Sequence, residues 1–143
     1  MSTQPRPLPQ PSPWSAPYWE AARQRRFVIQ ACRACDRPIM YPRKFCPHCL
    51  GDDLEFRPSA GTGEIYTVTT QVAGPPSGFA DALPYVIAVI RLDEGVQLMS
   101  NIVGDDRERA RIGDRVRVDF ETAGDGETVL PVFRLARAEG RAR

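Results

Sequence analysis

Cys32-Arg33-Ala34-Cys35 and Cys46-Pro47-His48-Cys49 are two C-x-x-C pairs separated by ten residues, and they form the strongest structural signal in the sequence. Tetrahedral zinc takes four thiolate or imidazole ligands at about 2.0 to 2.3 Å, and each pair can present two sulfurs from one tight turn. Two disulfides or a thioredoxin-like redox pair are the alternatives. Because both pairs lie in one short span without a secretory context, the spacing favours a structural zinc held by Cys32, Cys35, Cys46 and Cys49.

The zinc is expected to stabilise the ribbon rather than to catalyse, because a site with four thiolate ligands has no open position for water or substrate. The chain has four cysteines and a single histidine, His48, which lies inside the second pair. We expect His48 to face solvent or to support the metal ligands rather than to act as a base. Few side chains are then left for nucleophilic or general-base catalysis, so we predict no catalytic residue and no independent enzyme.

The residues before the first cysteine pair divide into a Pro-rich arm and a short helix. Six of the first 17 residues are proline, which favours extended chain, so we expect a flexible arm over residues 1–16. Apolar residues then recur every three to five positions, which indicates an amphipathic helix; they are Tyr18, Trp19, Ala22 and Phe27. Helix and rubredoxin-like ribbon should form one unit over residues 17–59. Short extended segments are expected within it at 27–29, 38–42 and 54–56.

The remainder of the chain is rich in β-branched and aromatic residues and offers five strand candidates separated by turn-forming residues. Five short strands with one helical interruption at 105–110 predict a mainly β protein whose second unit is a closed OB-fold barrel over residues 60–137, followed by a tail at 138–143. A small sandwich is the alternative. The expected strands are Gly63–Val72, Tyr85–Leu92, Val96–Val103, Arg115–Glu121 and Thr128–Leu135.

The charge of this 143-residue chain is nearly balanced overall but uneven along its length. Its formal net charge is +1, which argues against strong attraction of the whole molecule to nucleic acid or to an anionic membrane. Between residues 23 and 44, seven basic side chains accompany one acidic side chain, whereas from Gly61 onward ten basic side chains accompany thirteen acidic ones. The helix and ribbon are therefore electropositive, which suits phosphate recognition; a solvated basic face is the alternative.

Three features of the barrel region could bind ligands. The loop at 73–84 is long for a hairpin, and long loops on small barrels often carry binding sites. Gly61-Thr62-Gly63 leads into a strand rather than a helix, so we expect a tight turn or bulge there instead of a phosphate loop. Four strand aromatics could stack on bases, although core packing is favoured for them. They are Tyr66, Tyr85, Phe120 and Phe133.

The composition is that of a globular protein. With 42% hydrophobic residues the chain can bury a core. It has no stretch of about 20 apolar residues, and its Pro-rich N-terminus lacks an apolar signal core. We therefore expect a cytoplasmic protein that neither spans a membrane nor is secreted.

In their order along the chain, these motifs resemble the zinc-ribbon and OB-fold proteins catalogued as domain of unknown function thirty-five. The resemblance covers roughly residues 17–136, and the combination is more specific than any motif alone. The matching stretches are Pro17-Tyr18-Trp19-Glu20-Ala21-Ala22, Cys32 to Cys35, Tyr41-Pro42-Arg43, Cys46 to Cys49, Ser59-Ala60-Gly61-Thr62-Gly63, Pro84-Tyr85-Val86, Leu92-Asp93-Glu94-Gly95, Ile112-Gly113-Asp114 and Leu130-Pro131-Val132-Phe133.

The resemblance implies an accessory subunit of a heteromeric complex that processes CoA thioesters. The partner would be a thiolase-like protein, a lipid-transfer-protein-type aldolase or a hydratase of the hot-dog fold, and it would supply the catalytic residues. This subunit would stabilise the assembly and help to bind CoA and the acyl chain. The resemblance also implies that the four cysteines are metal ligands.

The residues that would contact the CoA thioester are inferred from charge and loop position rather than from a family motif. The basic side chains that would bind the CoA phosphates are Arg33, Arg37, Arg43 and Lys44. The loop residues that would line the pantetheine or acyl path are Pro76, Gly78 and Phe79. The helix bearing Tyr18 and Trp19 is expected to contribute to the partner surface.

Two other functions are open on the sequence alone. Ribbons and OB barrels both bind single-stranded nucleic acid, but the acidic balance of the barrel and the presence of one lysine, Lys44, argue against that function. A free-standing acyl-CoA carrier is the second alternative. No motif specifies the acyl group, the stoichiometry or the reaction of the partner, which could be thiolysis, retro-aldol cleavage or hydration.

Overall fold

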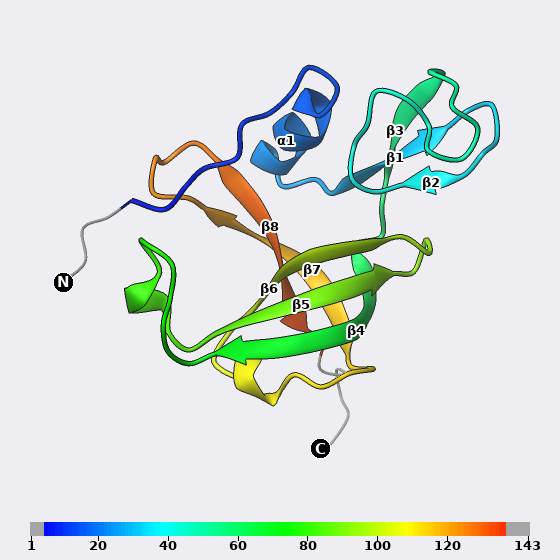
Figure 1. The fold of residues 1–143 in the computed structure, drawn as a ribbon. Coiled ribbons are helices and arrows are strands. Elements are labelled where there is room, and N and C mark those ends of the chain that lie inside the picture. Colours follow the sequence, from blue (N-terminus) through cyan, green and yellow to red (C-terminus); the bar gives the residue numbers. More distant parts are fainter. Residues whose placement is uncertain (1–4, 137–143) are drawn as a thin grey trace.

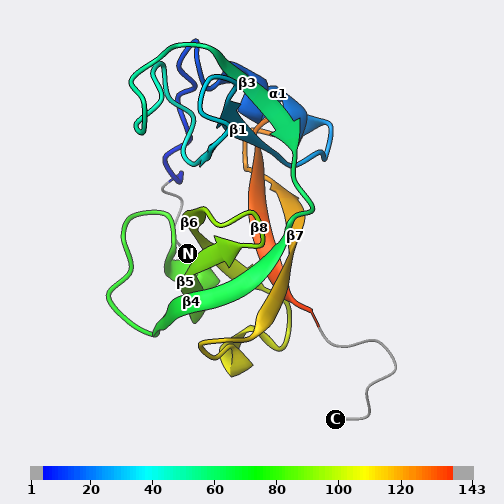
Figure 2. The same ribbon diagram turned by 90° about the vertical axis from the view of Figure 1, so that its right-hand side faces the viewer.

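The computed structural model describes residues 5–136, which form one α-helix, a small three-stranded sheet and a closed barrel. Figure 1 shows the helix and the small sheet together at one end of the barrel, and Figure 2 shows the same arrangement turned by 90°. The first four residues of the expected arm and the expected tail at 138–143 lie outside the described residues. No helix within residues 5–136 has both the length and the apolar character that a membrane crossing requires.

The helix α1 is shorter than expected. It spans Ala16–Arg23, and a proline in its first turn costs no hydrogen bond there. Arg25 then adopts a left-handed conformation with φ 58°, which ends the helix and redirects the chain. Phe27 therefore lies beyond the helix rather than on its apolar face, which corrects the sequence interpretation.

The small sheet has the strand order β2-β1-β3 and is antiparallel throughout. Its central strand is buried along its whole length: Val28 and Ile29 at its start belong to the core shared with the barrel, and Cys32 at its end belongs to the cysteine cluster. The expected extended segment at 38–42 is a strand only over its first two residues. The strands are β1 (Val28–Cys32), β2 (Pro38–Ile39) and β3 (Leu54–Pro58).

The barrel closes in the order β4-β5-β6-β8-β7, with β7 returning to pair with β4. All neighbouring strands are antiparallel except β6 and β8, which pair in parallel. This is the OB-fold topology, so the expected fold class is confirmed and the sandwich is excluded. The elements are β4 (Thr62–Gln71), η1 (Ala80–Ala82), β5 (Tyr85–Leu92), β6 (Gln97–Val103), η2 (Arg107–Arg109), β7 (Arg115–Thr122) and β8 (Val129–Leu135).

The glycines at the start of β4 let it approach two neighbours closely. Gly61 has φ 72°, and its carbonyl accepts a hydrogen bond from the Val118 amide at 2.7 Å. Gly63 packs against the backbone of β5, where any Cβ would collide with the Arg91 carbonyl. The segment is thus a tight entry into a strand, as expected, and not a phosphate loop.

Aromatic side chains connect the helix to the centre of the barrel. The ring of Tyr18 lies 5.1 Å from that of Trp19 and 6.2 Å from that of Phe27, whose ring lies 6.1 Å from that of Phe133. All three contacts are edge-to-face, the arrangement that aromatic quadrupoles favour. The helix and the barrel therefore share one apolar core.

Candidate metal centre and the adjoining surface

The four cysteine sulfurs converge at one end of the small sheet and all lie within 4.8 Å of one another. Sγ of Cys32 is 3.6 Å from Sγ of Cys49, and Sγ of Cys35 is 3.7 Å from Sγ of Cys46. Zinc–sulfur bonds of about 2.3 Å in a tetrahedron place the sulfurs about 3.8 Å apart, so these distances fit a single zinc ion. They are too long for disulfides, and all four thiols are free.

The two cysteine pairs lie on turns with the same backbone hydrogen bonds. In the first turn, the amide of Asp36 donates to the carbonyl of Cys32 at 2.7 Å, and in the second the amide of Leu50 donates to the carbonyl of Cys46 at 2.8 Å. The residue after each pair has a left-handed backbone, with φ 61° at Asp36 and 67° at Leu50. We call these turns the first and second knuckles, residues 32–36 and 46–50. Each presents two sulfurs on one side.

Burial and backbone dipoles act in opposite directions on the thiols. Burial raises the pKa of Cys35 to about 11. Burial also opposes ionisation of Cys46, but amide groups of Cys49 and His48 point at its sulfur and hold its pKa at about 7. A thiol with a pKa near neutral readily loses its proton to solvent when a metal binds, since the thiolate is the ligand.

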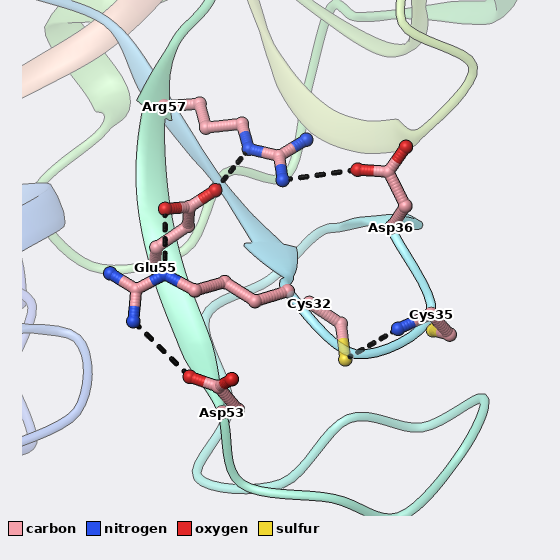
Figure 3. A network of polar contacts seen from close by, with 7 residues as sticks. Cys32, Cys35, Asp36, Asp53, Glu55 and Arg57 are labelled. Atoms are coloured by element: carbon pink, nitrogen blue, oxygen red, sulfur yellow. Dashed lines mark hydrogen bonds and ion pairs between the residues drawn. The ribbon is translucent and has the colours of Figure 1, made fainter.

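A network of ion pairs joins the first knuckle to β3 and to the residue before it. Arg33 contacts two carboxylates, with Nη1 3.1 Å from Asp53 and Nε 2.9 Å from Glu55. Glu55 also binds Arg57, which reaches Asp36 at 3.1 Å (Figure 3). These arginines hold the pKa of Glu55 below its usual range. The network was missed by sequence reasoning, because its members come from two segments about twenty residues apart.

The second knuckle has less side-chain support. Nδ1 of His48 lies 3.3 Å from Nη1 of Arg37 and, facing a donor, acts as the acceptor. His48 itself is exposed. The structure therefore places the lone histidine at the rim of the cysteine cluster, bound to a basic side chain.

The four basic residues proposed for phosphate contact fall into two groups. Arg33 is committed to Asp53 and Glu55, and Arg37 to His48. Arg43 and Lys44 are exposed and, within residues 5–136, take part in no ion pair. The ammonium of Lys44 lies over the ring of Phe45, 5.6 Å from its centre. Arg43 and Lys44, which are consecutive in the chain, therefore remain exposed cations, whereas Arg33 is neutralised.

Gln30 fixes the backbone beside these two cations. Its side chain, 2% exposed, is the one buried polar side chain among the described residues. The amide Nε2 donates to the carbonyl of Arg43 and Oε1 accepts from the Arg43 amide, both at 2.8 Å. Gln30 thus binds the chain as a neighbouring strand would. Its place as the single polar residue in the apolar run from Phe27 to Cys32 was a signal that sequence reasoning did not use.

The segment that holds these cations also joins the ribbon to the barrel. The backbone amide of Met99 on β6 donates to Oη of Tyr41 at 2.8 Å. Tyr41 precedes Arg43 by two residues, so the segment 41–45 is held at one end by the barrel and in the middle by Gln30. Sequence alone gave no indication of the contact with Met99.

The loop proposed as the acyl path borders a pocket of about 300 Å³. Phe79 packs on Tyr85 at 5.7 Å, and Arg6 of the N-terminal arm lies over Phe79 while donating to the carbonyl of Gly78 at 2.8 Å. Arg107 is fixed at the same pocket by bonds to two backbone carbonyls. Of the three loop residues proposed for the acyl path, Phe79 lines the pocket, whereas Gly78 and the exposed Pro76 do not.

The aromatic residues predicted on the barrel strands lie partly in the core and partly on the surface. Phe133 is completely buried, and Phe120 packs against the same core. Tyr66 is exposed beneath the guanidinium of Arg91, because it follows the buried Ile65 on β4 and alternation places it on the outer face. On the helix, Tyr18 is buried in the core, whereas Trp19 beside it is only partly buried; that this helix contributes to a partner surface stays a prediction.

Two family models match the chain in consecutive segments. The model described as ChsH2, rubredoxin-like zinc ribbon domain, matches residues 19–55, and the model described as ChsH2, C-terminal OB-fold domain, matches residues 56–121. The match to a zinc ribbon and the clustered cysteines together support a structural zinc.

Two relatives are similar over most of the chain. A "DUF35 domain-containing scaffold protein" of Methanothermobacter thermautotrophicus is 32% identical over 127 residues, which are 85% of this chain and 83% of that protein. A "Probable enoyl-CoA hydratase alpha subunit" of Thermomonospora curvata is 42% identical over 131 residues, 92% of this chain. The chain spans only 40% of the length of the second relative.

Two solved structures have a similar fold. The structure described as "Ltp2-ChsH2(DUF35) aldolase" matches with a TM-score of 0.80 and 40% identity, over 90% of this chain and 99% of that chain. A DUF35-family protein of unknown function from Sulfolobus solfataricus matches with a TM-score of 0.61 and 15% identity, over 88% of this chain and 87% of that chain. At that identity the second match shows the shared fold alone.

Proposed function

The chain belongs to the DUF35 family of paired zinc-ribbon and OB-fold proteins, and from this premise we propose that it is an accessory subunit of a heteromeric enzyme acting on CoA thioesters. The catalytic residues would belong to the partner, a thiolase-like protein or a lipid-transfer-protein-type aldolase. This chain would stabilise the complex and help to bind the CoA thioester.

One observation carries the proposal. The chain matches nearly the whole length of a chain in a structure described as an Ltp2-ChsH2(DUF35) aldolase, at 40% identity. The relative described as an enoyl-CoA hydratase alpha subunit supports a link to CoA thioesters, although this chain spans only part of it. The position of His48 at the cysteine cluster, away from the pocket beside Phe79, is consistent with a partner that supplies the acid–base groups.

Cys32, Cys35, Cys46 and Cys49 would hold the zinc. When bound, the ion would supply a structural cross-link between the two knuckles, since four thiolates complete a tetrahedral shell. The chain's own contribution is to orient the sulfurs, through the repeated turn hydrogen bonds and the amides that point at Cys46.

For the CoA phosphates, Arg43 and Lys44 are the better candidates of the four basic residues. Phosphate binding to an arginine already paired with two carboxylates must replace those contacts, so Arg33 is a poor candidate. The pocket lined by Phe79 is the proposed path for the pantetheine or acyl group, because it combines aromatic walls with the fixed cation Arg107.

Co-expression with a thiolase-like or lipid-transfer-protein-type aldolase from the same genome tests the proposed function. We expect the two chains to co-elute in size exclusion and the complex to turn over a CoA thioester that the partner alone processes poorly. Separate elution together with unchanged partner activity would overturn the proposal.

The phosphate assignment has a sharper test in the same complex. Replacing Arg43 and Lys44 by glutamate should raise KM for a CoA thioester by about tenfold or more, and much less for the corresponding dephospho-CoA thioester if they bind the 3′-phosphate. Arg109→Glu, at an exposed arginine on η2, is the matched control. Equal changes in KM for the control and the double variant would contradict the assignment of Arg43 and Lys44 to the CoA phosphates.

A further inference from the structure

The N-terminal arm, described from residue 5 to residue 15, is attached to a barrel loop far from it in the sequence. Nε of Arg6 donates to the carbonyl of Gly78 at 2.8 Å, and Nη2 lies 3.3 Å from Oδ1 of Asp81. The guanidinium also lies over the ring of Phe79, 4.7 Å from its centre. Arg6 and Phe79 both line the pocket of about 300 Å³. One side chain of the arm therefore holds the loop and covers part of the pocket.

The other end of the arm is fixed to the helix. The carbonyl of Ser12 accepts a hydrogen bond from the amide of Ala16, the first residue of α1, at 2.9 Å. Between the two attachments, Pro9 and Pro11 line a hollow together with Trp19 of α1. Proline at every second position from 5 to 13 favours extended chain with few accessible conformations. In Figure 1 the arm, drawn in dark blue, runs from α1 past the turn between β7 and β8 toward the loop that holds η1.

Arg6 covers a surface that a ligand in this pocket would use. The ring of Phe79 packs on that of Tyr85, 5.7 Å away, and the two rings are the aromatic walls of the pocket. Apolar and planar groups bind against such walls, where water is excluded. Because the guanidinium lies over the Phe79 ring, a ligand gains that face only when Arg6 leaves it.

The contacts of Arg6 are of a kind that opens easily. The side chains of Arg6 and Asp81 are 46% and 81% exposed, and ion pairs in contact with water contribute little to stability. A cation over an exposed aromatic ring adds a similarly small free energy. The closed arrangement therefore exchanges with an open one, and a ligand can shift that equilibrium.

We propose that the N-terminal arm is a strap that closes the Phe79 pocket through Arg6 and is released when a ligand binds there. The inference rests on the proposed function for the identity of the ligand, a CoA thioester, whereas the closure itself does not depend on it. The ligand competes with Arg6 for Phe79, so its apparent affinity is its intrinsic affinity multiplied by the fraction of molecules that are open. The strap thus controls entry to the pocket.

The test is the solvent exposure of the Phe79 ring in the full chain, measured by the relaxation that a soluble neutral nitroxide causes in its ring protons. Arg6→Ala uncovers the ring and should raise this relaxation by about twofold or more, and Asp81→Asn should raise it by less. Arg26→Ala is the matched control, because Arg26 is an exposed arginine bonded to a side chain of its own segment. The buried ring of Phe133 should keep its relaxation unchanged in every variant that is folded.

The outcomes separate this inference from the proposed function. Higher relaxation of Phe79 in Arg6→Ala and Asp81→Asn, with no change in Arg26→Ala, supports the closure. Equal relaxation of Phe79 in the wild type and in folded Arg6→Ala would overturn the strap and leave the proposed function standing. If the closure is supported but the wild-type chain forms no active complex with its partner, the proposed function fails and the strap remains.

Control of entry has its own readout in an active complex. Because fewer molecules are closed, Arg6→Ala should lower KM for the CoA thioester by about twofold or more with kcat unchanged. Arg26→Ala should leave KM as it is in the wild type. An unchanged KM in Arg6→Ala would show that the strap does not control entry to the pocket.

Discussion

The ribbon and the barrel are stabilised by different means. The cluster that supports the cysteine end of the ribbon consists of Cys32, Ile39 and Cys46, with Cys35 and Leu54 at its edge. Three of these five members are proposed metal ligands, and only two are aliphatic side chains. The barrel instead surrounds a continuous apolar core that extends to the helix. Apolar burial can therefore stabilise the barrel, whereas we expect the cysteine end of the ribbon to depend on its metal.

A second contrast lies within the ribbon. The two knuckles share the same backbone bonds, but only the first is held by carboxylates and arginines from β3. In the second knuckle Leu50 adopts a left-handed φ with its side chain in solvent. The first knuckle is therefore the more rigid half of the proposed zinc site.

Removing the metal should produce the largest effect. Structural zinc contributes about 10–16 kcal/mol of apparent binding free energy in zinc-finger peptides, so an excess of chelator should unfold the segment 32–51. Amide hydrogen exchange is the measurement. We expect fast exchange in that segment and slow exchange in the strands of the barrel. Equal loss of protection in both would show that the barrel also depends on the metal.

Creating a cavity in the barrel core should have the second largest effect. Phe133 has no exposed surface and contacts Phe27, so Phe133→Ala should lower the free energy of unfolding by about 3–5 kcal/mol. Denaturant-induced unfolding measures the change. Tyr66→Ala, at an exposed ring on the same barrel, is the control and should cost far less. A cost for Phe133→Ala similar to that of the control would contradict the assignment of the barrel core.

Neutralising the centre of the ion-pair network should have a smaller effect, confined to the ribbon. Glu55→Gln removes the charge that binds both Arg33 and Arg57, so the first knuckle should hold its metal less firmly. We expect zinc transfer to a chromogenic chelator to accelerate by about fivefold or less, because the network is partly exposed. Asp93→Asn breaks an ion pair on the barrel and should leave the transfer rate unchanged. An unchanged rate in Glu55→Gln would show that the network does not support the knuckle.

The smallest effect should be that of Asp93→Asn on stability. Hydrogen bonds from Arg115 and from Thr62 lower the pKa of Asp93 to about 2, below the ordinary value of 3.8. A carboxyl with a lowered pKa stabilises the fold above its unfolded pKa, and this contribution is lost as the pH falls toward 2. The variant should therefore be less stable at pH 7 by no more than about 1 kcal/mol, since the pair is half-exposed. Melting curves between pH 7 and 2 should converge; a constant difference would exclude the ion pair as its cause.

Much of the fold was predictable because its signals are local. The strand at Tyr85–Leu92 has the expected bounds, since β-branched residues alternate there between turns. The first cysteine pair and its copy predicted two similar turns, and the structure has them. The predicted helix extended too far, to Phe27, because an apolar periodicity does not reveal that Arg25 takes a left-handed conformation.

Less of the candidate site could be predicted. Arg33 has the appearance of a free cation in the sequence, yet the fold places β3 and its carboxylates beside it. Tyr41 and Met99 are 58 residues apart, and no pattern relates them. The irregularity in β4 between Ile65 and Thr67 depends on the pairing of β4 with β5, and no sequence pattern reveals it.

The sequence by itself determined the four-cysteine cluster and the alternation of the strands, because ligand spacing and side-chain periodicity are properties of short segments. The tertiary structure decided which charges are neutralised, how β6 and β8 pair to close the barrel, and which apolar side chains meet at the junction of ribbon and barrel. Those outcomes depend on distances between residues far apart in the chain, which packing alone sets.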